Sequence, residues 1–169
     1  WARKKQDNAA VQTKILTTFD SVTELLIGLL VIAVIPAIGE ELVFRGILQN
    51  EFYRGTKNIH VAIWAAAILF SAIHFQFYGF IPRMVLGALF GYLYYWSGSL
   101  PLAMFGHFVN NDVQVIALYF YQAGELEFDV ESTESVPAHF AVISTLITAG
   151  LLYYFYQHFR KFNPTSTSS

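Results

Sequence analysis

The residues of this sequence that could do chemistry begin with two adjacent carboxylates, Glu40 and Glu41, which follow directly on the apolar run 25–39. Moving a carboxylate from water into hydrocarbon costs at least a few kcal/mol, so an ionisable residue at such a place needs a function and a partner. At helical spacing Glu41 and Arg45 stand i,i+4 on one face and can pair. Glu40 points about 100° away from Glu41 and has no obvious local cation. We therefore expect Glu41 to be structural and Glu40 to be free to react.

Three further polar residues lie inside apolar stretches downstream. His74 is near the end of one stretch, and His107 and Asn111 share a helix face in another because they are four residues apart. A carboxylate in a low-dielectric pocket can act as a general base toward water, and a neighbouring imidazole can share the proton. A histidine N–H and an asparagine amide one turn away can donate to a developing oxyanion. Together these groups predict amide hydrolysis within a membrane.

Other hydrolytic chemistries fit the sequence less well. There is no cysteine to act as a nucleophile or zinc ligand, and the zinc signature His-Glu-x-x-His does not occur. Asp112 is the only aspartate well inside a predicted span, so a site of two aspartates lacks its second member. Ser97 and Ser99 flank Gly98, which favours a turn over a serine nucleophile.

Composition predicts the elements that must position these residues. The chain is 55% apolar and 13% charged and has a mean hydropathy of +0.45, far from an average soluble domain. A helix needs about 20 mostly apolar residues to cross a bilayer. Five stretches qualify: 22–38, 59–77, 80–97, 100–121 and 138–158. Residues 40–54 form a further helical stretch that continues or re-enters from the first span. We predict an all-α membrane protein, a polytopic bundle of about five transmembrane helices plus a motif-bearing helix after the first span.

Residues 1–160 are expected to form a single polytopic catalytic core and residues 161–169 a flexible tail. The chain opens on Trp1 and no signal peptide is recognisable before residue 20, so we expect a fragment or a trimmed product. The acidic segment 122–137 is interpreted as a solvated loop. Gly87 and Gly91 form a small-xxx-small face for close helix contact. Lys and Arg residues, Arg83 among them, nearly balance between the two sides, so membrane orientation is not predicted.

Three short motifs occur in order on successive predicted helices: Glu-Glu-Leu-Val-Phe-Arg at 40–45, Phe-Ser-Ala-Ile-His at 70–74 and His-Phe-Val-Asn-Asn at 107–111. They resemble the motifs Glu-Glu-x-x-x-Arg, Phe-x-x-x-His and His-x-x-x-Asn/Asp of the CAAX prenyl protease and bacteriocin-processing (CPBP, Abi or type II CAAX endopeptidase) family. All three motifs are complete. The resemblance implies an intramembrane glutamate endopeptidase, whose members typically carry additional spans before the first motif.

The resemblance also implies a role for each matching residue. The catalytic residues it implies are Glu40, His74, His107 and Asn111. Glu40 is then the base, His74 helps to activate water, and His107 with Asn111 forms the oxyanion site. Glu41 and Arg45 brace the first motif. Phe70, which opens the second motif, is a candidate for contact with the substrate.

Zinc held by Glu40, His74 and His107 is the nearest mechanistic rival, and no sequence feature separates it from metal-free water activation. We favour a site with no cofactor because asparagine is a weak zinc ligand and the second glutamate is expected to pair with Arg45. The expected partners are the lipid bilayer and a membrane-embedded or lipidated peptide or protein substrate, and no nucleic acid. The expected location is a multi-pass position in the membrane, the plasma membrane if the protein is prokaryotic.

Two functions other than proteolysis remain open. The protein could be a catalytically silent membrane scaffold or bacteriocin-immunity factor of the same fold, or a transport or proton-relay module. A relay predicts polar residues that continue to both membrane faces, and beyond Asp112 and Gln114 none continue, so a one-sided cavity fits better. A hydrolase requires Glu40 to meet the two histidines around one water-sized space, with Asn111 on its rim.

Overall fold

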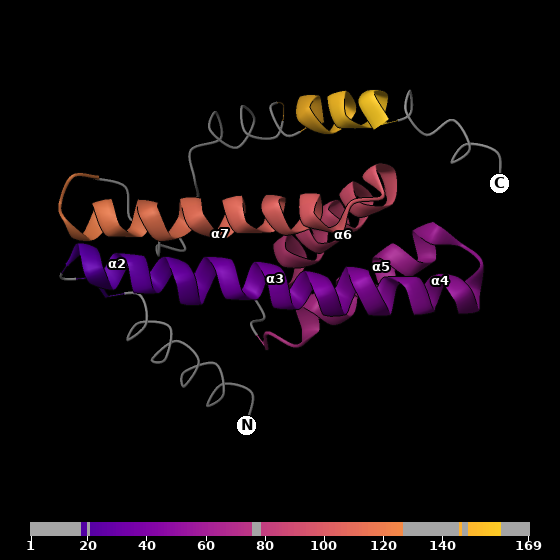
Figure 1. The fold of residues 1–169 in the computed structure, drawn as a ribbon, viewed down its shortest axis with the longest axis horizontal. Coiled ribbons are helices and arrows are strands. Elements are labelled where there is room, and N and C mark those ends of the chain that lie inside the picture. Colours follow the sequence, from indigo (N-terminus) through magenta and orange to yellow (C-terminus); the bar gives the residue numbers. More distant parts are fainter. Residues whose placement is uncertain (1–17, 20, 76–78, 127–145, 147–148, 160–169) are drawn as a thin grey trace.

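A computed structural model of the chain describes residues 18–19, 21–75, 79–126, 146 and 149–159 (Figure 1). Every regular element within these residues is helical, which confirms the predicted all-α class. The predicted fifth span, 138–158, lies mostly outside the described residues, although 149–159 are helical. Most of the acidic segment and the whole predicted tail also lie outside them.

One unbroken helix of 35 residues, Val22–Thr56, carries the first motif. Its parts are α2 (Val22–Gly28), the π-helical η1 (Leu29–Val34), α3 (Ile35–Glu41), the π-helical η2 (Leu42–Gln49) and α4 (Asn50–Thr56). The predicted first span and the motif-bearing stretch 40–54 are therefore one continuous element. In the described part of the chain it is the one helix that is long and apolar enough to cross a membrane by length and composition. The other predicted spans remain predictions as membrane crossings.

Local interactions set the two ends of this long helix. The Ser21 hydroxyl oxygen accepts a hydrogen bond from the backbone N–H of Glu24 at 3.2 Å, which satisfies one of the free N–H groups of the first turn. At the other end Lys57 has a φ of 54°, the left-handed conformation that commonly terminates a helix. At about 1.5 Å per residue the helix is roughly 50 Å long, which exceeds the roughly 30 Å of a bilayer core. A helix of this length that crosses a bilayer tilts or extends beyond the hydrocarbon.

Three more helices follow, namely α5 (Ile59–Ala72), α6 (Phe80–Ser97) and α7 (Leu100–Gln122). Asn58 caps α5, because its side-chain oxygen accepts from the backbone N–H groups of His60 and Val61. The bounds of α6 and α7 match the predicted stretches 80–97 and 100–121 to within one residue. Gly98 ends α6 with a φ of 65°, so the prediction of a turn at this point is confirmed.

Helix α5 is shorter than the predicted stretch 59–77. It ends at Ala72, and Phe75 has a left-handed backbone with a φ of 52°, which a continuing α-helix cannot accommodate. His74 therefore lies in the turn after the helix and not within a span, which corrects the prediction. Its backbone N–H donates to the carbonyl of Ser71 at 3.3 Å.

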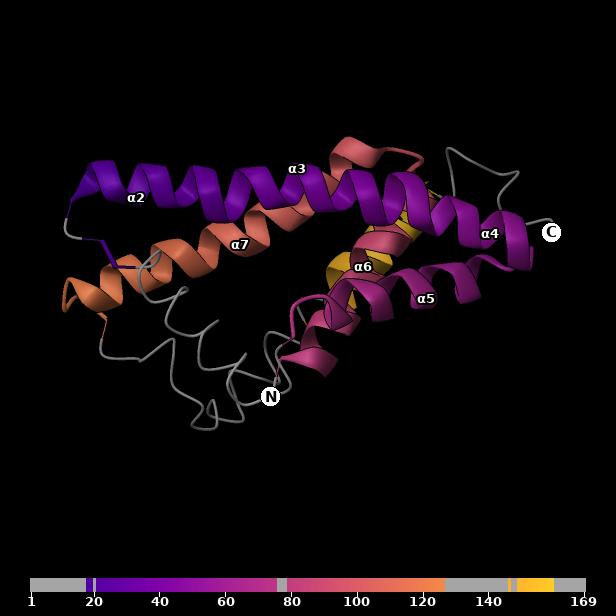
Figure 2. The ribbon, with the colours of Figure 1, turned by 90° about the horizontal axis from the view of Figure 1, so that it is seen from below.

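The long helix is flanked by two partners along its length (Figure 2). Helix α7 packs along η1 and α3, whereas α5 packs along η2 and α4, and α6 contacts both α5 and α7. Gly87 and Gly91 permit the close approach of α6: a Cβ would lie 3.0 Å from Phe70 Cδ1 at the first and 2.9 Å from Ile63 Cγ2 at the second. The predicted small-residue face is confirmed.

The outer surface of the long helix is apolar. Leu26, Ile35 and Ile47 are each more than half exposed, and other large apolar side chains surround them. A continuous apolar surface of this kind is unfavourable in water but matches lipid hydrocarbon. The surface thus agrees with an all-α membrane protein.

Candidate active site

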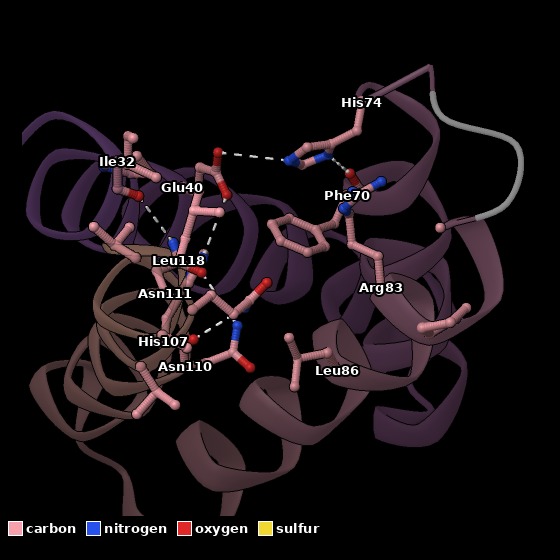
Figure 3. A pocket seen from close by; sticks show the side chains of 17 residues that line it. Ile32, Glu40, Phe70, His74, Arg83, Leu86, His107, Asn110, Asn111 and Leu118 are labelled. Atoms are coloured by element: carbon pink, nitrogen blue, oxygen red, sulfur yellow. Dashed lines mark hydrogen bonds and ion pairs between the residues drawn. The ribbon is translucent and has the colours of Figure 1, made fainter. Parts of the chain in front are cut away.

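Glu40, near the end of α3, faces a cavity between the helices (Figure 3). One carboxylate oxygen lies 3.8 Å from Nε2 of His74, and the other lies 3.8 Å from Nε2 of His107. These separations are too long for direct hydrogen bonds but suit a single bridging water. The predicted convergence of the Glu40 carboxylate with both imidazoles is confirmed by these distances.

Glu41 points into the protein and is fully buried, with 0% of its side chain exposed. One of its oxygens accepts from Arg45 Nη1 at 2.6 Å and from His107 Nδ1 at 2.8 Å. Arg45 is also buried and donates from Nη2 to the backbone carbonyl of Gly87 on α6 at 2.7 Å. The predicted Glu41–Arg45 pair is confirmed, and the structure adds His107 and α6 to the same network.

The hydrogen bonds made by each Nδ1 assign the proton positions on the two imidazoles. Nδ1 of His74 lies 2.7 Å from the carbonyl oxygen of Phe70, and Nδ1 of His107 faces the carboxylate of Glu41. A carbonyl or carboxylate oxygen only accepts, so each Nδ1 carries the proton. In the neutral ring Nε2 then has a lone pair and no proton. Both lone pairs are on the nitrogens nearest to Glu40.

Asn111 lies on the cavity wall, one helical turn beyond His107 on α7. Its Nδ2 donates to the backbone carbonyl of Ile32 at 3.2 Å. Pro36, four positions later, has no N–H with which to make an α-helical bond to this carbonyl. Asn111 therefore uses one amide hydrogen to join α7 to the long helix next to its proline. Its expected place on the rim is confirmed, and its oxyanion role stays a prediction.

The cavity has a volume of about 880 Å³, within the range of small-ligand sites in proteins. Its walls come from the long helix, from α6 and α7, and from the end of α5. Phe70 lines it, but the ring is only 2% exposed. The ring makes edge-to-face contacts with both imidazoles. The ring centroids are 5.1 Å apart for His74 and 5.8 Å apart for His107. Phe70 thus holds the histidines, and its contact with substrate stays a prediction.

Arg83 on α6 is a cavity residue that the sequence reasoning treated only as an orientation charge. In Figure 3 it lies on the wall that carries Phe70 and His74, opposite the wall that carries Glu40. Its charge is close enough to Glu40 for the two to interact. Its position inside the predicted span 80–97 could have indicated a functional role, because burying a charge there costs as much free energy as it does at Glu40.

A bound metal ion would need several ligands from the side chains of the site. No group of three or more His, Asp and Glu side chains in the described ranges is arranged to hold a metal ion. Glu41, the other carboxylate of the motif, already accepts from Arg45 and His107. In this arrangement Glu41 is therefore not available as a metal ligand.

Comparisons with known proteins place the chain in a family. Residues 22–113, more than half of the chain, match the family described as type II CAAX prenyl endopeptidase Rce1-like. An uncharacterized protein of Bacillus subtilis (strain 168), YpbD, is 32% identical over 104 residues, which cover 58% of this chain and 50% of that protein. The chain thus spans about half the length of this curated relative. No solved structure matches it. The chain belongs to the type II CAAX prenyl endopeptidase Rce1-like family.

Proposed function

We propose that this protein is an intramembrane endopeptidase that hydrolyses a peptide bond of a membrane-associated or lipidated peptide or protein. The observation that carries the proposal is the position of Glu40, whose carboxylate oxygens lie 3.8 Å from two imidazole nitrogens on the wall of a cavity. Membership of the Rce1-like family supports the same reaction class. A silent scaffold of the same fold has no need of such a cavity.

In the proposed reaction Glu40 is the general base. In this reaction a water molecule between its carboxylate and the imidazoles donates one hydrogen to Glu40 and the other to an imidazole Nε2. As the water oxygen forms a bond with the carbonyl carbon, Glu40 takes a proton and the carbonyl π electrons move to the oxygen. When the tetrahedral intermediate collapses, the C–N bond breaks and the proton on Glu40 passes to the leaving nitrogen. The products are a carboxylic acid and an amine, and Glu40 is again a carboxylate.

The other motif residues orient this reaction. Nε2 of His74 accepts a hydrogen bond from the water, since its ring is fixed by the Phe70 carbonyl. Nε2 of His107 in the neutral ring is the alternative acceptor for that hydrogen, and it can donate to the oxyanion only in the protonated ring. Asn111 has a second amide hydrogen with which it can donate to the oxyanion. Glu41 and Arg45 act through His107, whose orientation they fix.

The substrate must enter the cavity as an extended segment, because a helix hides its amide bonds in its own hydrogen bonds. The family description indicates a prenylated CAAX peptide, yet the cavity residues do not by themselves require a prenyl group. Cleavage of a farnesylated and of an unmodified peptide decides whether the substrate must be prenylated. The proposal also includes that the protein crosses the membrane more than once.

Two matched quenched-fluorescent CAAX peptides, one farnesylated and one unmodified, test the proposal on protein reconstituted in liposomes. We expect cleavage within the CAAX segment, with products identified by mass spectrometry. In H₂¹⁸O a single turnover should place one ¹⁸O atom in the new carboxylate, because water attacks the carbonyl directly. If neither peptide is cleaved, the scaffold alternative is favoured. If the single-turnover product contains only ¹⁶O, direct attack by water is wrong.

A further inference from the structure

The motif residues supply few hydrogen-bond donors for an oxyanion. Nε2 of His107 has no proton in the neutral ring, since Nδ1 donates to Glu41. Asn111 has already given one of its two amide hydrogens to the carbonyl of Ile32. Sites that hydrolyse amides normally aim more than one preorganised donor at the developing charge. A further donor is therefore expected in the cavity wall.

Arg83 has the chemistry of that donor. Its guanidinium carries five N–H groups and a permanent positive charge, so it can serve more than one acceptor at a time. It lines the same cavity as Glu40, His74 and His107. Its charge interacts with both Glu40 and His74, which places it within electrostatic reach of the water-activating pair. Figure 3 shows it on the wall opposite Glu40, so a carbonyl group bound between the walls lies between the two charges.

We propose that Arg83 is a catalytic residue that donates to the carbonyl oxygen of the scissile amide as negative charge develops there. The inference rests on the proposed hydrolase function. In the attack step Glu40 gains a proton and loses its charge, while the carbonyl oxygen gains one. A fixed cation on the far wall is then closer to the new charge than to the old one. It stabilises the transition state more than the ground state, which is the condition for an effect on kcat.

A different use of the same charge is to bind the terminal carboxylate of the substrate. That interaction is equally strong before and during the reaction, so its loss raises KM and leaves kcat nearly unchanged. It also disappears when the substrate ends in an amide. The two uses of Arg83 are therefore separable by kinetics on a pair of substrates.

The test measures kcat and KM on the farnesylated CAAX peptide, prepared with a free acid and with an amide at its C-terminus. Arg83→Gln should lower kcat by about 10²–10³-fold on both peptides, with little change in KM. Arg83→Lys keeps the charge but loses the planar fork, and should retain more activity than Arg83→Gln. Arg54→Gln is the matched control, because Arg54 is exposed on α4 and pairs with Glu51 at the surface. It should leave both constants unchanged.

The outcomes separate this inference from the proposed function. If the wild type cleaves the peptide and Arg83→Gln keeps its kcat, the inference is wrong and the hydrolase stands. A loss confined to KM on the free-acid peptide also overturns it, in favour of carboxylate binding. Should Arg83→Gln unfold in detergent, Arg83→Lys decides: wild-type KM with lowered kcat supports the inference, and unchanged kcat overturns it. If the wild type cleaves neither peptide, the proposed function fails and the inference fails with it.

Discussion

Glu40 and Glu41 are adjacent in the sequence but lie in opposite surroundings. Glu41 is fully buried and accepts hydrogen bonds from Arg45 and His107, whereas 27% of the Glu40 side chain is exposed in the cavity. One turn of about 100° between neighbouring helical residues is enough to separate them. The comparison shows that two carboxylates of one motif can have different roles. Glu41 stabilises the packing of the helices, and Glu40 remains available for reaction.

His107 joins the two surroundings. Its Nδ1 hydrogen bonds to Glu41 at 2.8 Å, and its Nε2 lies 3.8 Å from Glu40. The ring also stacks on Phe90, with centroids 5.0 Å apart and planes 17° apart. The buried network therefore sets both the tautomer and the direction of the nitrogen that faces the cavity, as outer partners do for functional histidines in general.

The largest expected effect comes from removing the base. Glu40→Gln keeps the volume of the side chain but cannot accept a proton, so we expect cleavage to fall by at least about 10²–10⁴-fold. The unfolding temperature in detergent should stay close to that of the wild type, because the side chain is partly exposed and does not take part in the buried network. Turnover of the farnesylated peptide and thermal unfolding measure the two effects. Near-normal turnover by this variant would show that another residue is the base.

The complementary change at the next position should act on stability. Glu41→Gln leaves the guanidinium of Arg45 buried without its carboxylate, and breaking a buried pair in this way costs about 3–5 kcal/mol. We expect a clear fall in the free energy of unfolding as well as in activity. Glu51→Gln is the matched control, since it breaks a pair with Arg54 that is exposed on both sides and should cost less than about 1 kcal/mol. Equal stability of the two variants would contradict the division between the carboxylates.

A smaller effect tests whether Asn111 belongs to the framework as well as to the cavity. Asn111→Leu removes the side-chain donor to the Ile32 carbonyl, which should cost about 1–3 kcal/mol. In a Pro36→Ala background the backbone N–H at position 36 can donate to that carbonyl, so the same substitution should cost less. The coupling in this double-mutant cycle, measured by unfolding in detergent, should be about 1 kcal/mol. Strictly additive effects would mean that Asn111 does not compensate for the proline.

Local spacing was sufficient to predict some of this structure. The i,i+4 separation predicted the Glu41–Arg45 pair, and the order of the three motifs on successive helices predicted that Glu40 meets both histidines. The helices α6 and α7 followed from apolar runs ended by Gly98 and by polar residues. In these cases neighbouring residues on one helix, or the length of an apolar run, decide the outcome.

Contacts between distant residues could not be predicted in the same way. The hydrogen bond from His107 to Glu41 joins residues 66 positions apart, and it depends on how α7 crosses the long helix. The end of α5 depends on a left-handed backbone at Phe75, a residue whose type gives no warning of it. Arg83 was counted as an orientation charge because its place in the cavity depends on the packing of α6.

The smallest expected effect is that of removing metal, and it decides what kind of site Glu40 belongs to. We expect less than stoichiometric zinc in active, purified protein, and unchanged turnover after treatment with a chelator. The described side chains do not form a group able to hold a metal, and the second carboxylate is committed to Arg45 and His107. Stoichiometric zinc, with activity lost to the chelator and restored by zinc, would contradict the metal-free proposal. Glu40 and the two Nε2 nitrogens would then be metal ligands. Glu41 would be the carboxylate that orients one of these ligands, His107. Elemental analysis of Glu40→Gln in parallel separates a metal bound at this site from one bound elsewhere, because only the former is lost with the carboxylate.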